Sequence, residues 1–381
     1  MPNKKQKILV GLSGGVDSAV ALYLLKKEGY DVEAAYMKCF SETINIKGEC
    51  PWKEDRLMAY RIAAQLDVPI QTLDFQKEYH EKVVDYIFDS YQKGLTPNPD
   101  ILCNNEIKFK LFLEYARDNS FDKIATGHYA QVTEDKDGFH LLRGKDPNKD
   151  QSYFLAGLTQ RKVSLAMFPI GHLEKTEVRK IATKAKLLNA DRKDSQGICF
   201  IGKVDLKTFL QQKIKPKAGV IEDTEGNKLG DHQGVWYYTI GQRKGLDLAG
   251  GPWYVADKNI KENKIIVAKE SAPELYKNLV QLTDLHWLGQ ERGLPLKAKA
   301  QIRYRQPAQE VKISSICLPG HSGAKQGETI ESPCTHLAEF KEPQKGVAAG
   351  QVLAIYAPYL RASKTSREVE EDELIASGDI L

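Results

Sequence analysis

The segment that most constrains this chain is Ser13–Ser18 (SGGVDS), which follows the apolar run Ile8–Val10 and precedes a helix-like stretch, residues 19–25. A buried strand, a glycine turn and a helix N-terminus together form an anion site, because free backbone N–H groups and the positive end of the helix dipole point at one place. The two glycines allow close approach of a phosphate. Asp17 adds a carboxylate where Mg²⁺ would bridge phosphate oxygens. The segment predicts a site for nucleotide phosphates.

Two other phosphate-binding motifs do not fit. A Walker-type P-loop needs Gly-Lys-Ser/Thr after its spacer, and the spacing of Gly11, Gly14 and Gly15 does not match the dinucleotide fingerprint. A tight glycine turn without a ligand stays open on the motif alone. The segment resembles the PP-loop of the N-type ATP pyrophosphatases, which cleave ATP between the α and β phosphates and adenylate a substrate. The loop alone does not select among these enzymes.

Composition limits the class of protein. With 381 residues the chain is long enough for two or three domains. Its net charge of +4 requires no nucleic-acid partner, so any such surface must be local. No apolar run approaches the length of a membrane span, and the six cysteines are too sparse for a disulfide scaffold. We expect a cytoplasmic protein with no membrane contact and no signal peptide.

The order of elements predicts the fold class. Strand and helix signals alternate through the first half, which favours a doubly wound parallel sheet with helices on both faces. From about residue 210 the pattern changes to glycine-rich turns and short strands. Ligands of such sheets lie outside the carboxyl ends of the strands. We therefore expect the 13–18 loop, Met37 and Gly127–His128 to converge on one site.

Two cysteines have unusual surroundings. Cys103 follows a proline turn and directly precedes a helix pattern, so we expect its thiol pKa to be lowered. Cys199 lies within Asp194–Gly202, between two glycines. Buried free cysteines are common, and for either residue alone an inert core position stays open. The turn and polar residues around both cysteines favour a chemical role.

Several blocks together resemble the tRNA-specific 2-thiouridylase family. They are NPDILCNNEIKF (98–109), DSQGICFIG (194–202), GHYA (127–130), KDQSYFL (149–155), YTIGQRKGL (238–246) and RYRQ (303–306). The two cysteine blocks are the most diagnostic. The resemblance implies a PP-loop ATP-binding and catalytic domain (1–209), a small mostly-β connecting domain (210–280) and a C-terminal tRNA-binding β-barrel (281–381).

The resemblance also implies the chemistry. The enzyme would use ATP with Mg²⁺ to adenylate the wobble uridine (U34) of tRNA and then insert sulfur at C2, releasing AMP and pyrophosphate. Cys199 would carry a persulfide. Cys103 would release the product by forming a disulfide with Cys199, or would liberate hydrosulfide from the persulfide, and the sequence leaves both routes open. The implied partners are Lys, Glu and Gln type tRNAs and a sulfur carrier or cysteine desulfurase. We expect a monomer without a permanently bound cofactor or metal.

The family pattern assigns roles to individual residues. The catalytic residues would be Cys103, Cys199 and Asp17. ATP contacts are implied at Gly11, Leu12, Ser13, Gly14, Gly15, Val16, Asp17, Ser18, Met37 and Gly127. Contacts with the target base and tRNA are implied at Asn98, Pro99, Asp100, His128, Lys149, Asp150, Gln151, Tyr304, Arg305 and Gln351.

Two charged stretches allow predictions from patterning. Alternation over residues 297–305 predicts a strand with Lys297, Lys299, Arg303 and Arg305 on one face, suited to RNA phosphates or simply solvated. The acidic stretch 368–373 predicts a solvated turn or edge.

The chain departs from the family pattern at Lys38-Cys39, where an Asn-Trp pair is common, and Cys50 follows. We interpret Cys39 and Cys50 as incidental, with an iron–sulfur cluster shared with the other two cysteines as an alternative. Two rival functions remain: a PP-loop ligase acting on a small molecule, and a tRNA-binding protein without catalysis.

Overall fold

The computed structural model describes residues 5–41, 51–194, 197, 199–201, 205–283, 285–317, 334–361 and 369–381. The chain divides into two compact units, and neither is continuous in sequence. Unit 1 comprises Met1–Tyr86, Pro99–Asp205 and Pro358–Ile375. Unit 2 comprises Ile87–Asn98, Leu206–Ala357 and Ala376–Leu381. The three-domain division at residues 209 and 280 stays a prediction.

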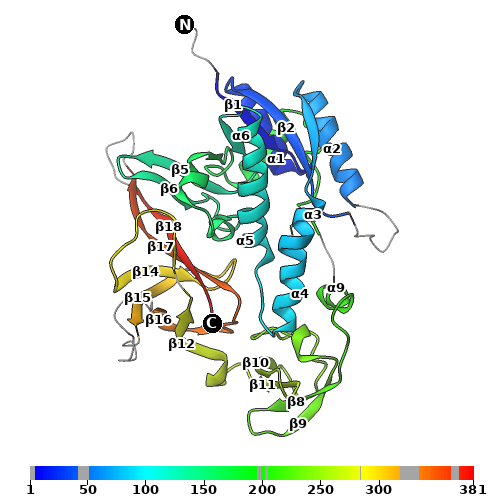
Figure 1. Cartoon of the computed structure of the whole chain (residues 1–381), viewed down its shortest axis with the longest axis vertical. Coiled ribbons are helices and arrows are strands. Elements are labelled where there is room, and N and C mark those ends of the chain that lie inside the picture. The colour runs from blue at the N-terminus through cyan, green and yellow to red at the C-terminus, as the bar shows by residue number, and fades with distance from the viewer. Residues whose placement is uncertain are drawn as a thin grey trace, which may run out of the picture. The chain divides into compact units, whose positions relative to one another are not determined.

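Unit 1 contains a five-stranded parallel sheet with the strand order β3-β2-β1-β4-β7 (Figure 1). Its strands are β1 (Lys7–Gly11), β2 (Asp31–Lys38), β3 (Ile70–Asp74), β4 (Lys123–Ala125) and β7 (Ala166–Met167). The central strand pairs on both sides, with Ile8 opposite Val32 and Lys123. The predicted doubly wound α/β fold is confirmed.

The side chains of β1 point alternately to the two faces of this sheet, and both faces are packed against helices. Ile8 and Val10 belong to one apolar cluster with residues of helix α1 (Val16–Lys27), because successive strand residues point to opposite faces. Gly11 faces the other side, where a Cβ atom would lie 3.6 Å from the ring of Phe112. Each face is thereby covered by helices, as parallel sheets require.

The helices of unit 1 include two π-helical segments that hydrophobic spacing did not predict. The elements are α2 (Pro51–Gln65), α3 (Gln76–Tyr79), a π-helical segment (His80–Val84), α4 (Asp85–Gln92, which runs into unit 2), α5 (Pro99–Cys103), a second π-helical segment (Asn104–Leu111), α6 (Phe112–Asp118), 3₁₀ segment Ser152–Leu155, α7 (Gln160–Ser164) and α8 (Lys175–Lys184). In Figure 1, α5 and α6 lie in one continuous column.

A hairpin of β5 (Ala130–Asp135) and β6 (Gly138–Arg143) turns at Lys136–Asp137 and pairs with the far end of the chain. Leu142 of β6 lies opposite Glu373 of β18 (Val369–Asp379). Glu373 is buried and its carboxylate contacts the His140 ring nitrogen at 2.7 Å. The prediction of a solvated turn or edge at 368–373 is therefore wrong for Glu373, because the hairpin covers it. Glu368 lies outside the described residues.

Unit 2 is mostly β. Its elements are α9 (Leu206–Gln211), β8 (Gly219–Asp223), β9 (Lys228–His232), 3₁₀ segment Val235–Tyr237, β10 (Tyr254–Asn259), β11 (Lys264–Ala268), 3₁₀ segment Pro273–Leu275, β12 (Tyr276–Leu282), β13 (His286–Trp287), β14 (Leu296–Gln301), β15 (Gln309–Cys317), β16 (Cys334–Lys345) and β17 (Val352–Arg361).

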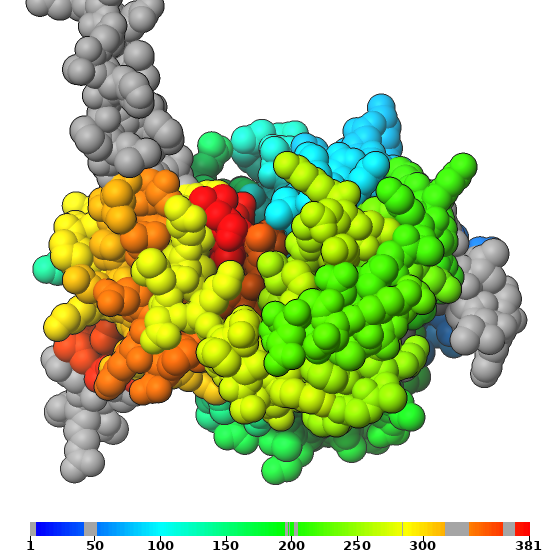
Figure 2. All heavy atoms as spheres, turned by 90° about the horizontal axis from the view of Figure 1, so that it is seen from below, coloured from blue at the N-terminus to red at the C-terminus, as the bar shows by residue number. Residues whose placement is uncertain are grey.

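These strands form two groups. One sheet has the order β10-β11-β8-β9, and residues 219–268 occupy a contiguous green to yellow-green surface in Figure 2. The other strands run β12-β16-β15-β14-β17 with antiparallel neighbours. The strand predicted over 297–305 ends at Gln301, because the chain then turns and Arg305 takes a φ of 65°. No helix in the described ranges is long and apolar enough to cross a membrane.

Candidate active site

The 13–18 loop is folded by its own hydroxyl groups. The backbone N–H of Ser13 donates to Ser18 Oγ at 3.2 Å, and that of Gly15 donates to Ser13 Oγ at 3.3 Å. The Ser18 hydroxyl donates to the Gly15 carbonyl at 3.1 Å. Gly14 has a φ of 82°, where a side chain would be strained. Helix α1 follows directly, and no described side chain caps its start, so its first N–H groups can donate hydrogen bonds to an anion.

The predicted convergence of three segments is present. A Cβ atom on Gly127 would lie 2.7 Å from the Asp17 carbonyl carbon and the Ser18 nitrogen, so only glycine fits where the end of β4 meets the loop. Met37 Cε lies 3.1 Å from where a Cβ on Gly11 would stand. These positions suit nucleotide contacts, and ATP binding by each residue stays a prediction.

The Asp17 carboxylate is already paired. Lys175 Nζ lies 2.7 and 2.9 Å from its two oxygens, and the Tyr129 hydroxyl donates to it at 2.8 Å. Lys175 comes from the first turn of α8, whose side is packed against α1. The loop therefore presents a carboxylate and an ammonium group together, which suits a magnesium–phosphate ligand of mixed charge.

Lys175 also reaches the segment that leads to Cys199. Its Nζ lies 2.7 Å from Asp194 Oδ1, and Lys149 Nζ lies 2.7 Å from Asp194 Oδ2. Arg179 donates to Asp194 at 2.6 Å as well. Burial would raise the pKa of Asp194, but Lys149 and Lys175 lower it to about 2. One charged cluster thus joins the phosphate loop to the start of the second cysteine block.

The two cysteines lie side by side although 96 positions separate them. The Cys103 thiol donates to the Cys199 sulfur, with an Sγ–Sγ distance of 3.6 Å. Both backbone groups of Cys199 are held: its N–H donates to Asp100 Oδ1 at 2.9 Å, and its carbonyl accepts from the Tyr79 hydroxyl at 2.5 Å. The next residue, Phe200, has a φ of 63°, an uncommon conformation for a bulky residue.

The two thiols have opposite electrostatics. The hydrogen bond from Cys103 lowers the pKa of Cys199 against the effect of burial, and Lys108 lowers it further. Burial raises the pKa of Cys103 well above its ordinary value. The expected lowering of the Cys103 pKa by a helix N-terminus is therefore wrong, because Cys103 ends α5 within a helical run that began at Pro99. Cys199 is the favoured thiolate.

Four residues assigned to tRNA contact lie inside unit 1. His128 is 7% exposed, and its Nδ1 lies 2.5 Å from Thr126 Oγ1. Asp150 is also buried and accepts from Arg143 at 2.8 Å and from the Gly144 N–H at 2.9 Å. Gln151 accepts from the Tyr129 N–H, and Lys149 pairs with Asp194. Each of these four side chains is held by a partner within unit 1, and contact with tRNA stays a prediction.

The remaining tRNA candidates belong mostly to unit 2. Tyr304 and Arg305 lie in the turn after β14, where the Arg305 guanidinium is 5.3 Å from the Tyr304 ring centroid. Gln351 Nε2 donates to the carbonyls of Thr96 and Pro97 at 2.8 and 3.2 Å. These hydrogen bonds fix the loop that leads to Asn98. Pro99 then opens α5.

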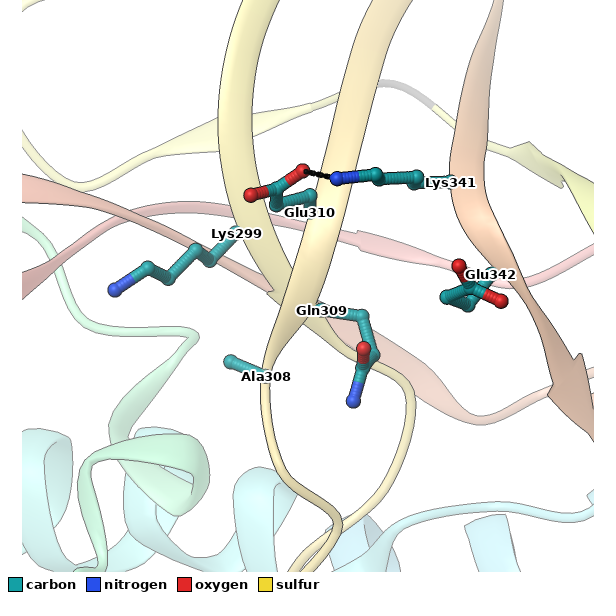
Figure 3. A pocket seen from close by; sticks show the side chains of 6 residues that line it. All are labelled: Lys299, Ala308, Gln309, Glu310, Lys341 and Glu342. Atoms are coloured by element: carbon teal, nitrogen blue, oxygen red, sulfur yellow. Dashed lines mark hydrogen bonds and ion pairs between the residues drawn. The ribbon is translucent and has the colours of Figure 1, made fainter.

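A surface hollow of about 340 Å³ lies elsewhere, on unit 2. Figure 3 shows its lining, in which Lys341 pairs with Glu310. Lys299 of the predicted basic strand lines it, but it contains no residue of the 13–18 loop or of the cysteine blocks, so it is not the site that they form. Within the described ranges, no group of three His, Cys, Asp or Glu side chains could hold a metal ion. Cys39 is buried, and Cys50 lies outside the described residues.

Sequence reasoning missed four residues that the structure brings to the site. They are Tyr79, Lys108, Lys175 and Arg179. Lys108 lies within a quoted block, and the helix pattern at 175–181 was visible. No spacing rule connects these positions to a cysteine or a loop far away in sequence.

Comparisons with known proteins identify the family of the chain. Models described as "tRNA methyl transferase HUP domain" and "tRNA methyl transferase PRC-barrel domain" match residues 6–203 and 207–269. The tRNA-specific 2-thiouridylase MnmA 1 of Geobacillus kaustophilus is 44% identical over 93% of this chain and 93% of its own. The MnmA proteins of Shouchella clausii and Hydrogenovibrio crunogenus are 43% and 44% identical, covering 92% and 93% of this chain and 93% and 92% of their own. The chain belongs to the family of tRNA-specific 2-thiouridylases.

Proposed function

We propose that this protein is an ATP-dependent sulfurtransferase that replaces O2 of the wobble uridine of tRNA with sulfur. The observation that carries the proposal is the 3.6 Å contact between Cys103 and Cys199, with Asp100 and Tyr79 fixing the Cys199 backbone. Neither a small-molecule ligase nor a passive tRNA-binding protein accounts for a polarised thiol pair. The relatives' names supply the substrate class.

The first half of the reaction is activation of the base. A uracil carbonyl is a poor electrophile because oxide is a poor leaving group. O2 of the uridine attacks the α-phosphate of ATP, pyrophosphate departs, and O2 becomes part of an AMP leaving group. The loop N–H groups and Lys175 stabilise the departing charge. Asp17 suits Mg²⁺, which takes one or two carboxylates plus phosphate oxygens and would neutralise phosphate charge when bound.

The second half is sulfur transfer. The Cys199 thiolate attacks the outer sulfur of a donor persulfide, and the donor leaves as a thiolate. The Cys199 persulfide then attacks C2 of the activated base, and AMP leaves. Cys103 attacks Cys199 Sγ, so the S–S bond to the base breaks with both electrons left on the sulfur that becomes C2=S. The resulting disulfide needs an external dithiol reductant before another turnover.

Hydrosulfide release is the alternative for Cys103. In that route Cys103 attacks the persulfide first, and free hydrosulfide attacks C2. Both routes end in the same disulfide, because the two sulfur atoms are close enough to bond after a shift of roughly 1.5 Å. Trapping the base on Cys199 through sulfur in a Cys103→Ser variant supports the first route, and its absence supports the second.

The testing experiment is thiolation of an unmodified wobble-uridine tRNA with ATP, Mg²⁺, a persulfide sulfur donor and a dithiol reductant. Thiolated product is read on mercury-containing gels, and AMP release is measured in parallel. Product that depends on ATP and Cys199 supports the proposal. Cys199→Ser protein that binds tRNA but thiolates as well as wild type contradicts it.

Methyl transfer is tested in a separate assay, because the descriptions of the matching family models name it. Incubation with S-adenosylmethionine instead of ATP and the persulfide donor tests it directly. We expect no methylated tRNA, since a methyl donor needs neither a loop for pyrophosphate nor a pair of thiols.

A further inference from the structure

Lys108 is carried to the two thiols by an unusual helical turn. It lies five residues after Cys103, inside the π-helical segment Asn104–Leu111. In an α-helix, residues five apart point roughly 140° away from each other. The wider turn of a π-helix, with its i→i+5 hydrogen bonds, reduces this angle, so such residues lie nearer the same side. The π-helical turn therefore brings Lys108 to the side of the helix on which Cys103 meets Cys199.

The surroundings of the Lys108 ammonium are aromatic and neutral on one side. Nζ lies 3.5 Å from His128 Nε2 and 5.7 Å from the centre of the Phe200 ring. Lys108 donates here, so Nε2 is the acceptor and His128 Nδ1 carries the proton toward Thr126 Oγ1. Burial and the nearby Lys108 lower the pKa of His128 well below its ordinary value. His128 is thus a neutral acceptor that orients the ammonium.

The charged groups that face Lys108 are the two thiols and Asp100. Burial alone would lower the pKa of Lys108, but Cys199 and Cys103 raise it, and the net direction is upward. Cys103, Lys108 and Asp100 face the Cys199 sulfur. Cys39 and Tyr79 also lie near it, and burial raises the pKa of each of these two groups. Lys108 is the cation in this group, so it has the charge that a thiolate needs.

We propose that Lys108 is a positioning residue that holds the Cys199 sulfur as an anion, first as the thiolate and then as the persulfide. The inference rests on the proposed function for its purpose, because accepting a sulfur atom requires the thiolate. It concerns the free enzyme, however, and needs neither ATP nor tRNA to be tested.

The test is the pH dependence of Cys199 alkylation by iodoacetamide, followed peptide by peptide with mass spectrometry. Cys199 is partly exposed and Cys103 is buried, so the two peptides report separately. We expect Lys108→Met to raise the midpoint of Cys199 alkylation by about one pH unit, a roughly tenfold slower reaction at neutral pH. Lys108→Arg keeps the charge and restores most of the rate.

The matched control is Lys110→Met. Lys110 lies on the same π-helical segment and pairs with Glu106 at 2.9 Å, away from the thiols. Its substitution should leave the Cys199 midpoint unchanged. An unchanged midpoint in Lys108→Met overturns the proposal, and so does an equal shift in Lys110→Met. If Lys108→Met does not fold, Lys108→Gln replaces it, and an unchanged midpoint there has the same meaning.

A second readout connects the inference to turnover. The acid limb of the thiolation rate should move upward in Lys108→Met and return in Lys108→Arg, whereas a purely structural loss would lower the rate at every pH. An alkylation shift with no thiolation in wild type would leave Lys108 supported and the proposed function contradicted. The two failures are therefore distinguishable.

Discussion

The Tyr79 hydroxyl donates a hydrogen bond of 2.5 Å to the carbonyl oxygen of Cys199. Tyr79 is fully buried, and its ring meets Phe200 edge to face at 5.8 Å. A residue from the start of one helical run thus fixes the backbone of a cysteine 120 positions later. Because the Cys199 N–H is held by Asp100 as well, the sulfur has a defined position before any ligand arrives.

Removing this hydroxyl should impair sulfur transfer more than ATP binding. We expect Tyr79→Phe to reduce thiolation about tenfold, since a lost buried hydrogen bond costs about 1–2 kcal/mol. The KM for ATP should stay within twofold. Steady-state kinetics with either substrate varied gives both values. Tyr91→Phe is the control, a buried tyrosine of unit 2 with an ordinary hydroxyl partner in Thr239. Equal losses in both variants would argue against a specific role.

Lys175 should matter chiefly for ATP. Lys175→Met removes the ammonium group beside Asp17, and we expect the KM for ATP to rise about tenfold, near 1.4 kcal/mol. Asp194 keeps Lys149 and Arg179, so the fold should persist. Lys145→Met is the matched control, because this surface lysine pairs at 2.9 Å with Glu177, a residue on the same helix as Lys175. A KM for ATP that does not change would exclude phosphate contact by Lys175.

Gly127→Ala tests the contact between β4 and the loop. The new Cβ would stand 2.7 Å from backbone atoms of Asp17 and Ser18, which cannot move independently of α1. We expect at least a tenfold loss of AMP release and a destabilisation of about 1–3 kcal/mol by overpacking. Gly293→Ala has open space around its Cβ and should be silent. Urea unfolding and AMP assays on both proteins make the comparison, and equal behaviour would show that the loop can yield.

The His140 cluster predicts a pH-dependent stability. Burial opposes a charge on His140, but Glu373 and Asp135 raise its pKa overall. A raised folded pKa means that the stabilisation is full below the unfolded pKa of about 6.5 and is lost as the pH rises through the folded pKa. Hydrogen bonding from His140 lowers the pKa of Asp135 to about 2, so the carboxylate side is lost only in strong acid.

We therefore expect His140→Gln to reduce the free energy of unfolding more at pH 5.5 than at pH 8.5. The difference should be no larger than about 1 kcal/mol, because solvent screens the pair. Urea denaturation at the two pH values measures it. A larger loss at pH 8.5 would reverse the assigned sign.

The sequence predicted correctly the elements that depend only on residues close together in the chain. The strand, loop and helix at residues 8–25 are neighbours in the chain, so the sequence predicted them correctly. The predicted strand over 297–305 was too long. Basic and apolar residues still alternate in the sequence after Ile302, where the backbone has already turned. Residue spacing does not report where hydrogen-bond pairing stops.

The chemistry depended on distance across the fold. The pairing of Cys103 with Cys199 came from family resemblance, because no spacing rule brings residues 96 positions apart together. The charge state of Cys103 was mispredicted, since its burial was invisible and outweighs any helix-end effect. Lys108 was overlooked because helical periodicity assumes 3.6 residues per turn, and a π-helical turn changes which side chains share a face.

The pairing of β6 with β18 has a consequence for synthesis on the ribosome. The nucleotide-binding half is translated first, but the strand that covers the β6 edge is made last. At translation speeds of about 5–20 residues per second, that edge waits for roughly ten to fifty seconds. An uncovered strand edge recruits other chains. A fragment cut after residue 205 should therefore aggregate, and nascent chains of this protein should need a chaperone until β18 has been made.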